Sequence, residues 1–307
     1  AMASRPGIYL LEHVNLNILD RSNGIAFYCD LLGCQQNTRR PKESALHSNC
    51  GYLTQFHTQV TDAAQLWRGP IEVVYTEDEL KKVIARAKAS TTTHSGFTEM
   101  GSRALRVTCP YGNEIVLRAA APAELRYFSD KKNGVRPLSE GSTALGLAAV
   151  TVRCPIGTAR NIAKFYLEVF QFPIQYEHRC ASGLPRTTVL TTNGAQHIYF
   201  QEAEGVDVKD DNGEHLAIYI GDYEECFKRC QKQGVVWVNP RFTHLDNTLT
   251  LEEAVESRNY RIRDIVDTVT GKLLLRLEHE VRAVDHFRSP LAIAKNIKKS
   301  PRERSKL

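Results

Sequence analysis

The feature that most constrains the fold is a pattern of one strand, one helix and three further strands, which recurs four times along the 307 residues. The first copy opens at residues 11–18, where apolar and polar side chains alternate with the period of two expected of a strand. A run with helical spacing follows and ends before Gly33, a residue typical of helix C-caps. Two extended stretches flank Gly51. Four such copies predict two modules of two consecutive repeats each.

The segment between the second and third copies has a different character. Residues 121–144 contain Pro122, Gly134 and Pro137 without a long hydrophobic period, and this composition predicts a linker. The predicted domains are a first module at 8–120, the linker at 121–144, a second module at 145–283 and a basic tail at 284–307.

The positive charge of the chain is concentrated at its C-terminal end. Of 40 Lys and Arg and 35 Asp and Glu residues, eight basic and two acidic ones lie in residues 282–307, which leaves 32 basic and 33 acidic residues elsewhere. The folded body therefore offers no large basic surface for a nucleic-acid backbone. No apolar run approaches the roughly 18 residues of a membrane span. We expect neither nucleic acid nor membrane as a partner.

The cellular location is predicted from the cysteines and from the last three residues. The eight cysteines include no C-x-x-C pair, which is typical of reduced thiols in an intracellular protein. The chain ends in Ser305-Lys306-Leu307, the S-K-L signal that the peroxisomal import receptor reads, on a polar and basic segment. We expect import from the cytosol into the peroxisome through this receptor.

The first strand and helix resemble those of a known superfamily. The run His13-Val14-Asn15-Leu16-Asn17, the helix at 26–33 and its second copy at 163–170 are similar to the opening of vicinal oxygen chelate proteins. These include glyoxalase I, extradiol dioxygenases, methylmalonyl-CoA epimerase and the fosfomycin and bleomycin resistance proteins. The resemblance covers about residues 8–283, and more narrowly it points to two-module glyoxalase-like proteins of unassigned reaction. It implies an α+β fold of two modules, each built from paired βαβββ units whose curved, mainly antiparallel sheet encloses a cup.

The resemblance also implies a divalent metal in the cup. Its ligands are a His on the first strand of one unit, a His on the first strand of the partner unit and a Glu on a closing strand, a set that suits Fe, Mn, Zn, Ni or Co. His13 and His215 match the two histidine positions, one in each predicted module. The other positions carry side chains that cannot bind a metal: Pro70, Val116, Ala149 and Leu274. Any bound metal must therefore use substitute ligands.

Strand parity supplies substitutes for the second cup, because residues two apart share a face. Glu278 shares the face of Leu274, whereas His279 points to the opposite face. We expect the second cup to gather Tyr199 with a two-histidine, one-carboxylate metal set formed by His197, His215 and Glu278. The alternative for Glu278 is a solvent-exposed strand end.

The first cup is expected to hold an organic anion. By the same parity it combines His13, Gln55, His57 and Arg118, which offer more hydrogen-bond donors than metal ligands. The alternative for Arg118 is a salt bridge. The candidate catalytic residues are His13, His215 and Tyr199, and the candidate substrate-binding residues are Gln55, His57, Arg118 and Arg276.

Three functions remain open on the sequence alone. One is a lyase, isomerase or dioxygenase that uses a metal as a Lewis acid on a small oxygen-rich or anionic metabolite. Another is a metal-free enzyme in which a cup histidine is the general base and Arg118 or Tyr199 orients an anion. The third is a metal-free protein that binds or sequesters a small organic ligand. Peroxisomal targeting favours a metabolic enzyme.

Overall fold

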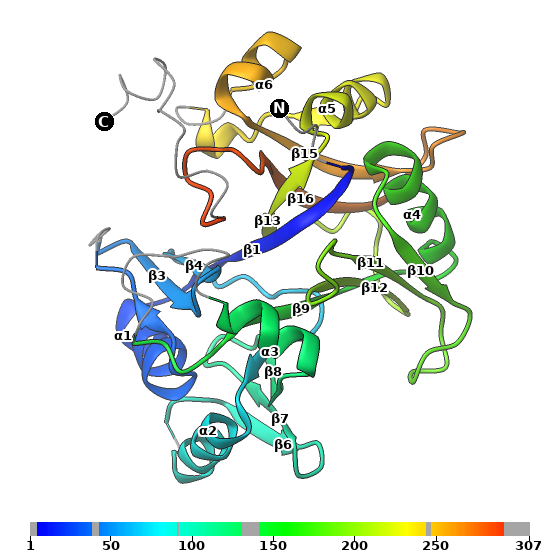
Figure 1. The fold of residues 1–307 in the computed structure, drawn as a ribbon. Coiled ribbons are helices and arrows are strands. Elements are labelled where there is room, and N and C mark those ends of the chain that lie inside the picture. Colours follow the sequence, from blue (N-terminus) through cyan, green and yellow to red (C-terminus); the bar gives the residue numbers. More distant parts are fainter. Residues whose placement is uncertain (1–4, 39–42, 91, 131–140, 244–246, 292–307) are drawn as a thin grey trace. The chain divides into compact units, whose positions relative to one another are not determined.

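The computed structural model describes residues 5–38, 43–90, 92–130, 141–243 and 247–291. These residues form two eight-stranded mixed sheets with helices (Figure 1), which confirms the predicted α+β fold of two modules. None of the helices in the described ranges is long and apolar enough to cross a membrane. The Ser305-Lys306-Leu307 signal and most of the basic tail lie outside the described residues.

The first sheet has the strand order β14-β15-β16-β13-β1-β4-β3-β2. The pairs β1/β4 and β13/β16 are parallel, whereas β2/β3, β3/β4, β14/β15 and β15/β16 are antiparallel. The bounds are β1 (Gly7–Ile18), β2 (Gln35–Gln36), β3 (Ala45–Cys50), β4 (Thr54–Val60), β13 (His215–Gly221), β14 (Val236–Trp237), β15 (Asn259–Val266) and β16 (Leu273–Ala283).

The second sheet has the order β10-β11-β12-β9-β5-β8-β7-β6, with β5 and β8 parallel. Its strands are β5 (Ile71–Tyr75), β6 (Gly96–Glu99), β7 (Ala104–Thr108), β8 (Glu114–Ala119), β9 (Gly146–Pro155), β10 (Ile174–Glu177), β11 (Arg186–Leu190) and β12 (His197–Ala203). The helices are α1 (Arg21–Gly24), η1 (Ile25–Leu31), α2 (Glu77–Ala89), α3 (Pro122–Ser129), α4 (Ala159–Phe165), η2 (Tyr166–Phe170), α5 (Tyr223–Lys232), η3 (Pro240–Phe242) and α6 (Leu251–Ser257).

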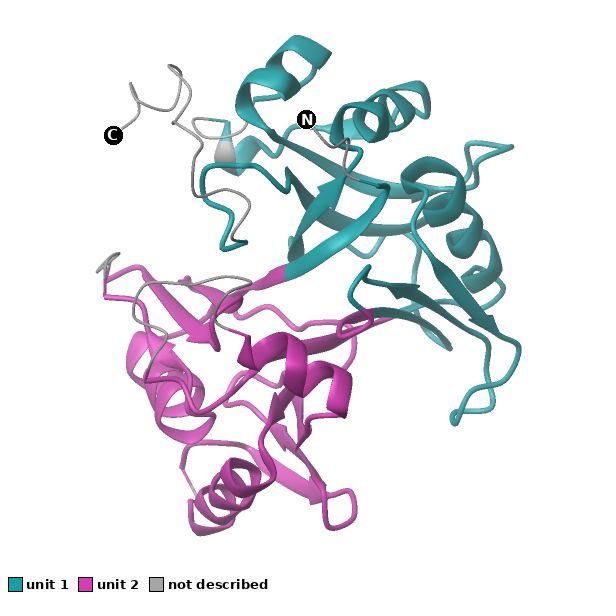
Figure 2. Ribbon diagram, in the orientation of Figure 1, with its two compact units in different colours: residues 1–11, 153–193, 198–307 teal, residues 12–152, 194–197 magenta. Residues whose placement is uncertain are grey.

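The four repeats are distributed over the sheets in an order that the sequence did not predict. The first and fourth repeats contribute the strands of the first sheet, and the second and third repeats contribute those of the second. The expectation that consecutive repeats share a sheet is wrong, because hydrophobic periodicity describes each repeat and carries no information about its partner. By contact density the chain divides into unit 1 (residues 1–11, 153–193 and 198–307) and unit 2 (residues 12–152 and 194–197), as Figure 2 shows. The predicted domain limits stay a prediction.

The first and third repeats share an uncommon helix geometry. In each, a short α-helix continues into a π-helix, from α1 into η1 and from α4 into η2. Asp20 is the N-cap of α1, and its carboxylate accepts a hydrogen bond from the Asn23 amide at 2.7 Å. After η1 the chain turns at Gly33, which has a φ of 73°. A π-turn is rare in general. Its presence at the same place in both copies supports the internal duplication.

Helix α3 lies within the segment predicted as a linker, where the sequence showed turn residues but no period. It begins at Pro122, and the Glu124 carboxylate caps it by accepting from the Ala121 amide at 2.6 Å. Phe128 is 1% exposed, and a Cβ added at Gly146 of β9 would lie 2.3 Å from its ring. The helix therefore packs directly on the backbone of the second sheet, and only glycine permits this approach at position 146.

Replacing Phe128 by alanine should destabilise unit 2 by about 3–5 kcal/mol, because the backbone of β9 cannot collapse to fill the space. The free energy of unfolding can be measured by urea denaturation. The control is Leu125→Ala on the same helix, where the side chain is 41% exposed and the expected change is within about 0.5 kcal/mol. Equal losses in the two variants would contradict the proposed packing.

Candidate metal and substrate site

Polar and charged side chains on one face of the first sheet are buried. They include His13 and Asn15 on β1 and Glu278, Glu280 and Arg282 on β16, none more than 6% exposed. The predicted alternative of a solvent-exposed strand end for Glu278 is therefore wrong. Buried polar groups are costly unless they are hydrogen-bonded or ion-paired, so the partners of these side chains define the chemistry of the sheet.

Three histidines of unit 2 are stacked. The rings of His13 and His57 have centroids 3.7 Å apart, and those of His57 and His47 are 4.0 Å apart. His47 and His57 are directly opposite one another on the antiparallel strands β3 and β4. The stack brings together His13 and His57 as the sequence predicted, and it adds His47.

Hydrogen bonds fix the orientation of two of these rings. Nδ1 of His13 lies 3.0 Å from Oε2 of the buried Glu12, and Nε2 of His57 lies 2.6 Å from Oε1 of Gln55. Gln55 in turn donates its amide to Asn49. Because Oε1 of Gln55 can only accept, Nε2 of His57 donates in this hydrogen bond.

Unit 1 carries a ladder of charged side chains on β13, β15 and β16. Glu280 accepts from Nε of Arg282 at 2.8 Å through Oε1, while its Oε2 lies 3.3 Å from Arg261 and 4.0 Å from Nε2 of His215. Arg282 also donates to the hydroxyl of Tyr219 at 3.0 Å. The carboxylate of Glu280 is thus oriented by two guanidinium groups beside an imidazole.

Glu278 has a separate set of partners. Arg261 donates to one carboxylate oxygen, and Nδ2 of Asn239 donates to the other at 2.8 Å. Burial raises the pKa of Glu278 above its ordinary value, and Arg261 and Asn239 act in the opposite direction. Both oxygens of Glu278 therefore accept hydrogen bonds, and neither is directed at His215.

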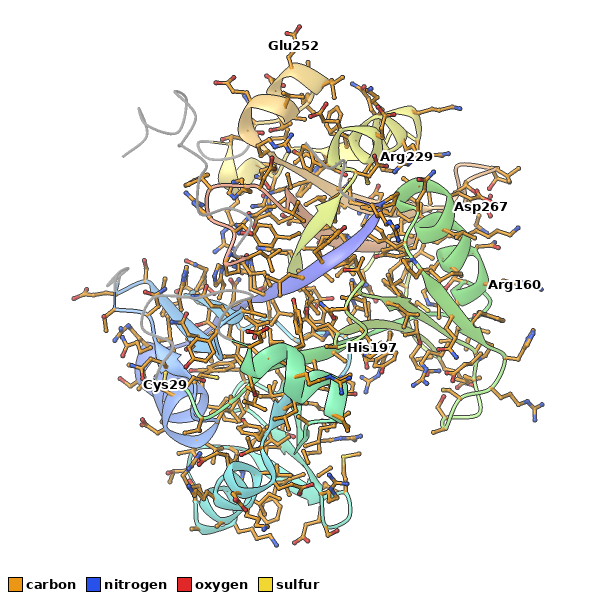
Figure 3. All side chains as sticks on the ribbon, in the orientation of Figure 1. Cys29, Arg160, His197, Arg229, Glu252 and Asp267 are labelled. Atoms are coloured by element: carbon orange, nitrogen blue, oxygen red, sulfur yellow. The ribbon has the colours of Figure 1, made fainter. Side chains whose placement is uncertain are left out.

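Several predicted site residues lie elsewhere. His197, labelled in Figure 3, and Tyr199 are on β12 of the second sheet, so the predicted gathering of these residues with His215 and Glu278 in one cup is wrong. The cause is the pairing of the repeats, which places the third repeat in a different sheet from the fourth. Arg276 on β16 has Nε 3.4 Å from the carboxylate of Asp264, an ion pair at the strand surface.

Arg118 is also outside the first sheet. It lies on β8 of the second sheet, where it donates to Glu72 at 2.8 Å and makes two hydrogen bonds to Glu124 of α3. Its predicted place beside His13, Gln55 and His57 is wrong, and the salt-bridge alternative is correct. Arg118 fastens α3 to the sheet.

Strand parity itself holds on β16. His279 points away from Glu278 and Glu280, as predicted, and is fully buried. Its Nδ1 donates to the Leu277 carbonyl at 2.8 Å, and Nε2 is paired with the hydroxyl of Tyr166 on η2. Burial lowers the pKa of His279 to about 4, so the ring is neutral at physiological pH.

Four contributors to the polar face were missed by the sequence reasoning: His47, Asn49, Arg261 and Arg282. His47 and Asn49 have a recognisable signal, because both lie at alternate positions of the strand that precedes Gln55 and His57. The two arginines have none, since their partners are specified by sheet pairing rather than by local pattern.

Comparisons with known proteins identify the fold. No protein-family model matches the sequence, and no curated protein matches it. A candidate dioxygenase from Bacillus subtilis aligns with a TM-score of 0.54 and 12% identity over 96% of this chain and 90% of that chain. A mutant of glyoxalase I from Zea mays aligns with a TM-score of 0.53 and 12% identity over 91% of this chain and 93% of the other.

The chain has the vicinal oxygen chelate fold. This confirms the resemblance drawn from the sequence. At 12% identity the likeness establishes the fold alone, and the same fold supports several chemistries. The function of this chain therefore has to be argued from its own side chains.

The buried His279 should make stability depend on pH. Its folded pKa of about 4 lies below the ordinary value of about 6.5, so the unfolded chain binds an extra proton between these pH values. This contribution is fully present above pH 6.5 and is lost as the pH falls to 4, by up to about 3 kcal/mol. His279→Gln should remove this part of the pH dependence. Urea denaturation of both proteins from pH 4.5 to 7.5 measures it, and identical slopes would refute the assignment.

Proposed function

We propose that this chain is a vicinal oxygen chelate enzyme that binds a divalent metal through His215 and Glu280 of unit 1 and acts on a small oxygen-rich or anionic metabolite. The observation that carries the proposal is this pair of buried donors: Nε2 of His215 lies 4.0 Å from Oε2 of Glu280. An imidazole nitrogen and a carboxylate oxygen are both ligand atoms that divalent transition metals use.

The partners of each donor fit this role. Arg282 holds Oε1 of Glu280, whereas Oε2 lies 3.3 Å from Arg261 and 4.0 Å from Nε2 of His215. A bound metal would supply Lewis acidity to stabilise negative charge on a substrate oxygen.

The remaining polar groups have roles that follow from their contacts. His57 is held against His13 by stacking and by its bond to Gln55. We assign His57 the role of a general base toward the substrate, since an imidazole is the side chain that most often performs this role. The stack limits the movement of His57, so its base would be held in one orientation.

Replacing His215 by alanine should weaken Mn²⁺ binding by roughly a hundredfold or more, because it removes a direct ligand, and even indirect partners contribute tenfold to a hundredfold. Isothermal titration calorimetry on the full chain, after purification without affinity-tag nickel, measures the affinity. The matched control is His197→Ala, a histidine of the second sheet, which should bind Mn²⁺ as the wild type does.

Two results would contradict the metal proposal. One is equal loss of affinity in His197→Ala and His215→Ala, which would place the metal elsewhere. The other is a wild-type chain that binds neither Mn²⁺ nor Fe²⁺. The second result would favour a metal-free protein that binds a small organic ligand, a function supported by the ion pairs that already engage Glu278 and Glu280.

We also propose that the protein is imported into the peroxisome through Ser305-Lys306-Leu307. The support is the S-K-L sequence and the basic segment that precedes it.

Deleting Leu307 should abolish import, because the receptor reads the complete terminal tripeptide. A fluorescent protein fused to the N-terminus leaves this end intact, and microscopy should show puncta that coincide with a peroxisomal marker. The deletion should make the fluorescence diffuse. A control deletion of the three residues 292–294, far from the signal, should leave the puncta. An unchanged pattern after loss of Leu307 would show that the signal is not used.

A further inference from the structure

Two cysteines of unit 2 face each other across an antiparallel strand pair. On β2 and β3, Gln35 is opposite Asn49 and Gln36 is opposite Ser48. The next step of the same register places Cys34, just before β2, opposite Cys50, the last residue of β3. Both are free thiols and both are buried.

The hydrogen-bond pattern shows which kind of pair they form. The amide of Asn37 donates to the carbonyl of His47 at 2.8 Å, so residues 37 and 47 are a hydrogen-bonded pair. Along antiparallel strands, hydrogen-bonded and non-hydrogen-bonded pairs alternate. Three steps along this register, residues 34 and 50 form a non-hydrogen-bonded pair, the class in which the Cα atoms are about 4.5 Å apart. The amide of Cys34 donates instead to the Tyr28 carbonyl at 3.1 Å, in agreement with this assignment.

This separation lies within the range that a disulfide spans, whose Cα atoms are roughly 4.4–6.8 Å apart. The two side chains also share one face of the strands, because directly opposite residues do. On the same face Cys29 of η1, labelled in Figure 3, has its sulfur 3.6 Å from the hydroxyl of Ser48. The geometry therefore brings two thiols into reach, with a third thiol close by.

We propose that Cys34 and Cys50 are a modification site, at which a peroxide oxidant forms a reversible cross-strand disulfide. One thiol attacks the O–O bond of the peroxide, giving a sulfenic acid and, for hydrogen peroxide, one water. The second thiol then displaces the hydroxyl of the sulfenic acid as a second water and forms the S–S bond. Both thiol protons leave in water, and two electrons pass from the sulfurs to the peroxide.

The resting state is the dithiol. The hydrogen bond with Cys50, together with burial, raises the pKa of the Cys34 thiol well above its ordinary value. Since the thiolate is the reactive form, oxidation is slow at neutral pH and requires sustained peroxide. A disulfide across paired strands is a constrained geometry, and strained disulfides are the more easily reduced ones.

The cross-link would act on the polar face through the backbone. It would close residues 34–50 into a ring and tie the edge strand β2 to β3. Cys50 follows Asn49, which accepts the hydrogen bond from Gln55. Oxidation would therefore fix the strand that supports Gln55 and, through it, His57.

The test counts thiols in the full chain. The reduced protein is treated with hydrogen peroxide, quenched with catalase, denatured and alkylated, and the intact mass gives the number of free cysteines. We expect a fall from eight to six, a Cys34–Cys50 linked peptide on digestion, and recovery of all eight after dithiothreitol. Cys34→Ser and Cys50→Ser should each keep seven thiols, and circular dichroism verifies that each variant is folded.

The matched control is the other buried pair, Cys226 and Cys230 of α5, which lies on either side of the hydroxyl of Tyr260. The double variant Cys226→Ser/Cys230→Ser should still lose two thiols, from six to four. The proposal is overturned if the wild type keeps eight thiols, if the linked peptide joins other cysteines, or if Cys34→Ser loses thiols as the wild type does.

Discussion

The arrangement of the first sheet depends on a neutral ladder of buried charges. Arg261 and Arg282 are matched by Glu278 and Glu280 on adjacent positions of β15 and β16. A single buried ion would cost several kcal/mol, and removing one partner of such a pair leaves that cost unpaid. All four charged side chains are therefore needed together. Because Glu280 must stay paired with its arginines, it is held beside His215. The other buried polar residues of the sheet include the Glu12 carboxylate, which lies 3.0 Å from Nδ1 of His13, and side-chain amides such as Gln55, which donates to Asn49.

The second sheet carries a helix where the first sheet carries buried charged side chains. It is built from the same kind of repeat, but helix α3 packs on it, with Phe128 against Gly146 and Glu124 paired with Arg118. Where the first sheet has buried histidines and carboxylates, the second has Val116 and Ala149 at the positions that a metal would need. Duplication has thus produced one sheet with ligand-type donors and one whose corresponding face supports a helix.

The sequence predicted which face of a strand each side chain occupies, but it did not predict which repeats pair in a sheet. Parity placed Glu278 on the polar face and His279 on the opposite face, because the side chains of a strand alternate whatever the strand pairs with. It placed His197 and Arg118 wrongly, since the partner of a repeat is decided by packing across more than a hundred residues. Parity cannot choose between Glu278 and Glu280, because both share a face and only their arginine partners in the sheet distinguish them.

The charge of the ladder also bears on the class of substrate. Two arginines and two carboxylates leave this part of the polar face neutral, so a divalent cation bound to Glu280 would add two uncompensated positive charges to a buried region. Such charges are costly unless a counter-ion accompanies them. An anionic substrate that ligates the metal supplies that counter-ion. When the substrate leaves, the positive charge of the metal is again uncompensated. Under the proposed function, metal and anion should therefore bind more tightly together than either does alone, which favours an acidic, oxygen-rich metabolite over a neutral one.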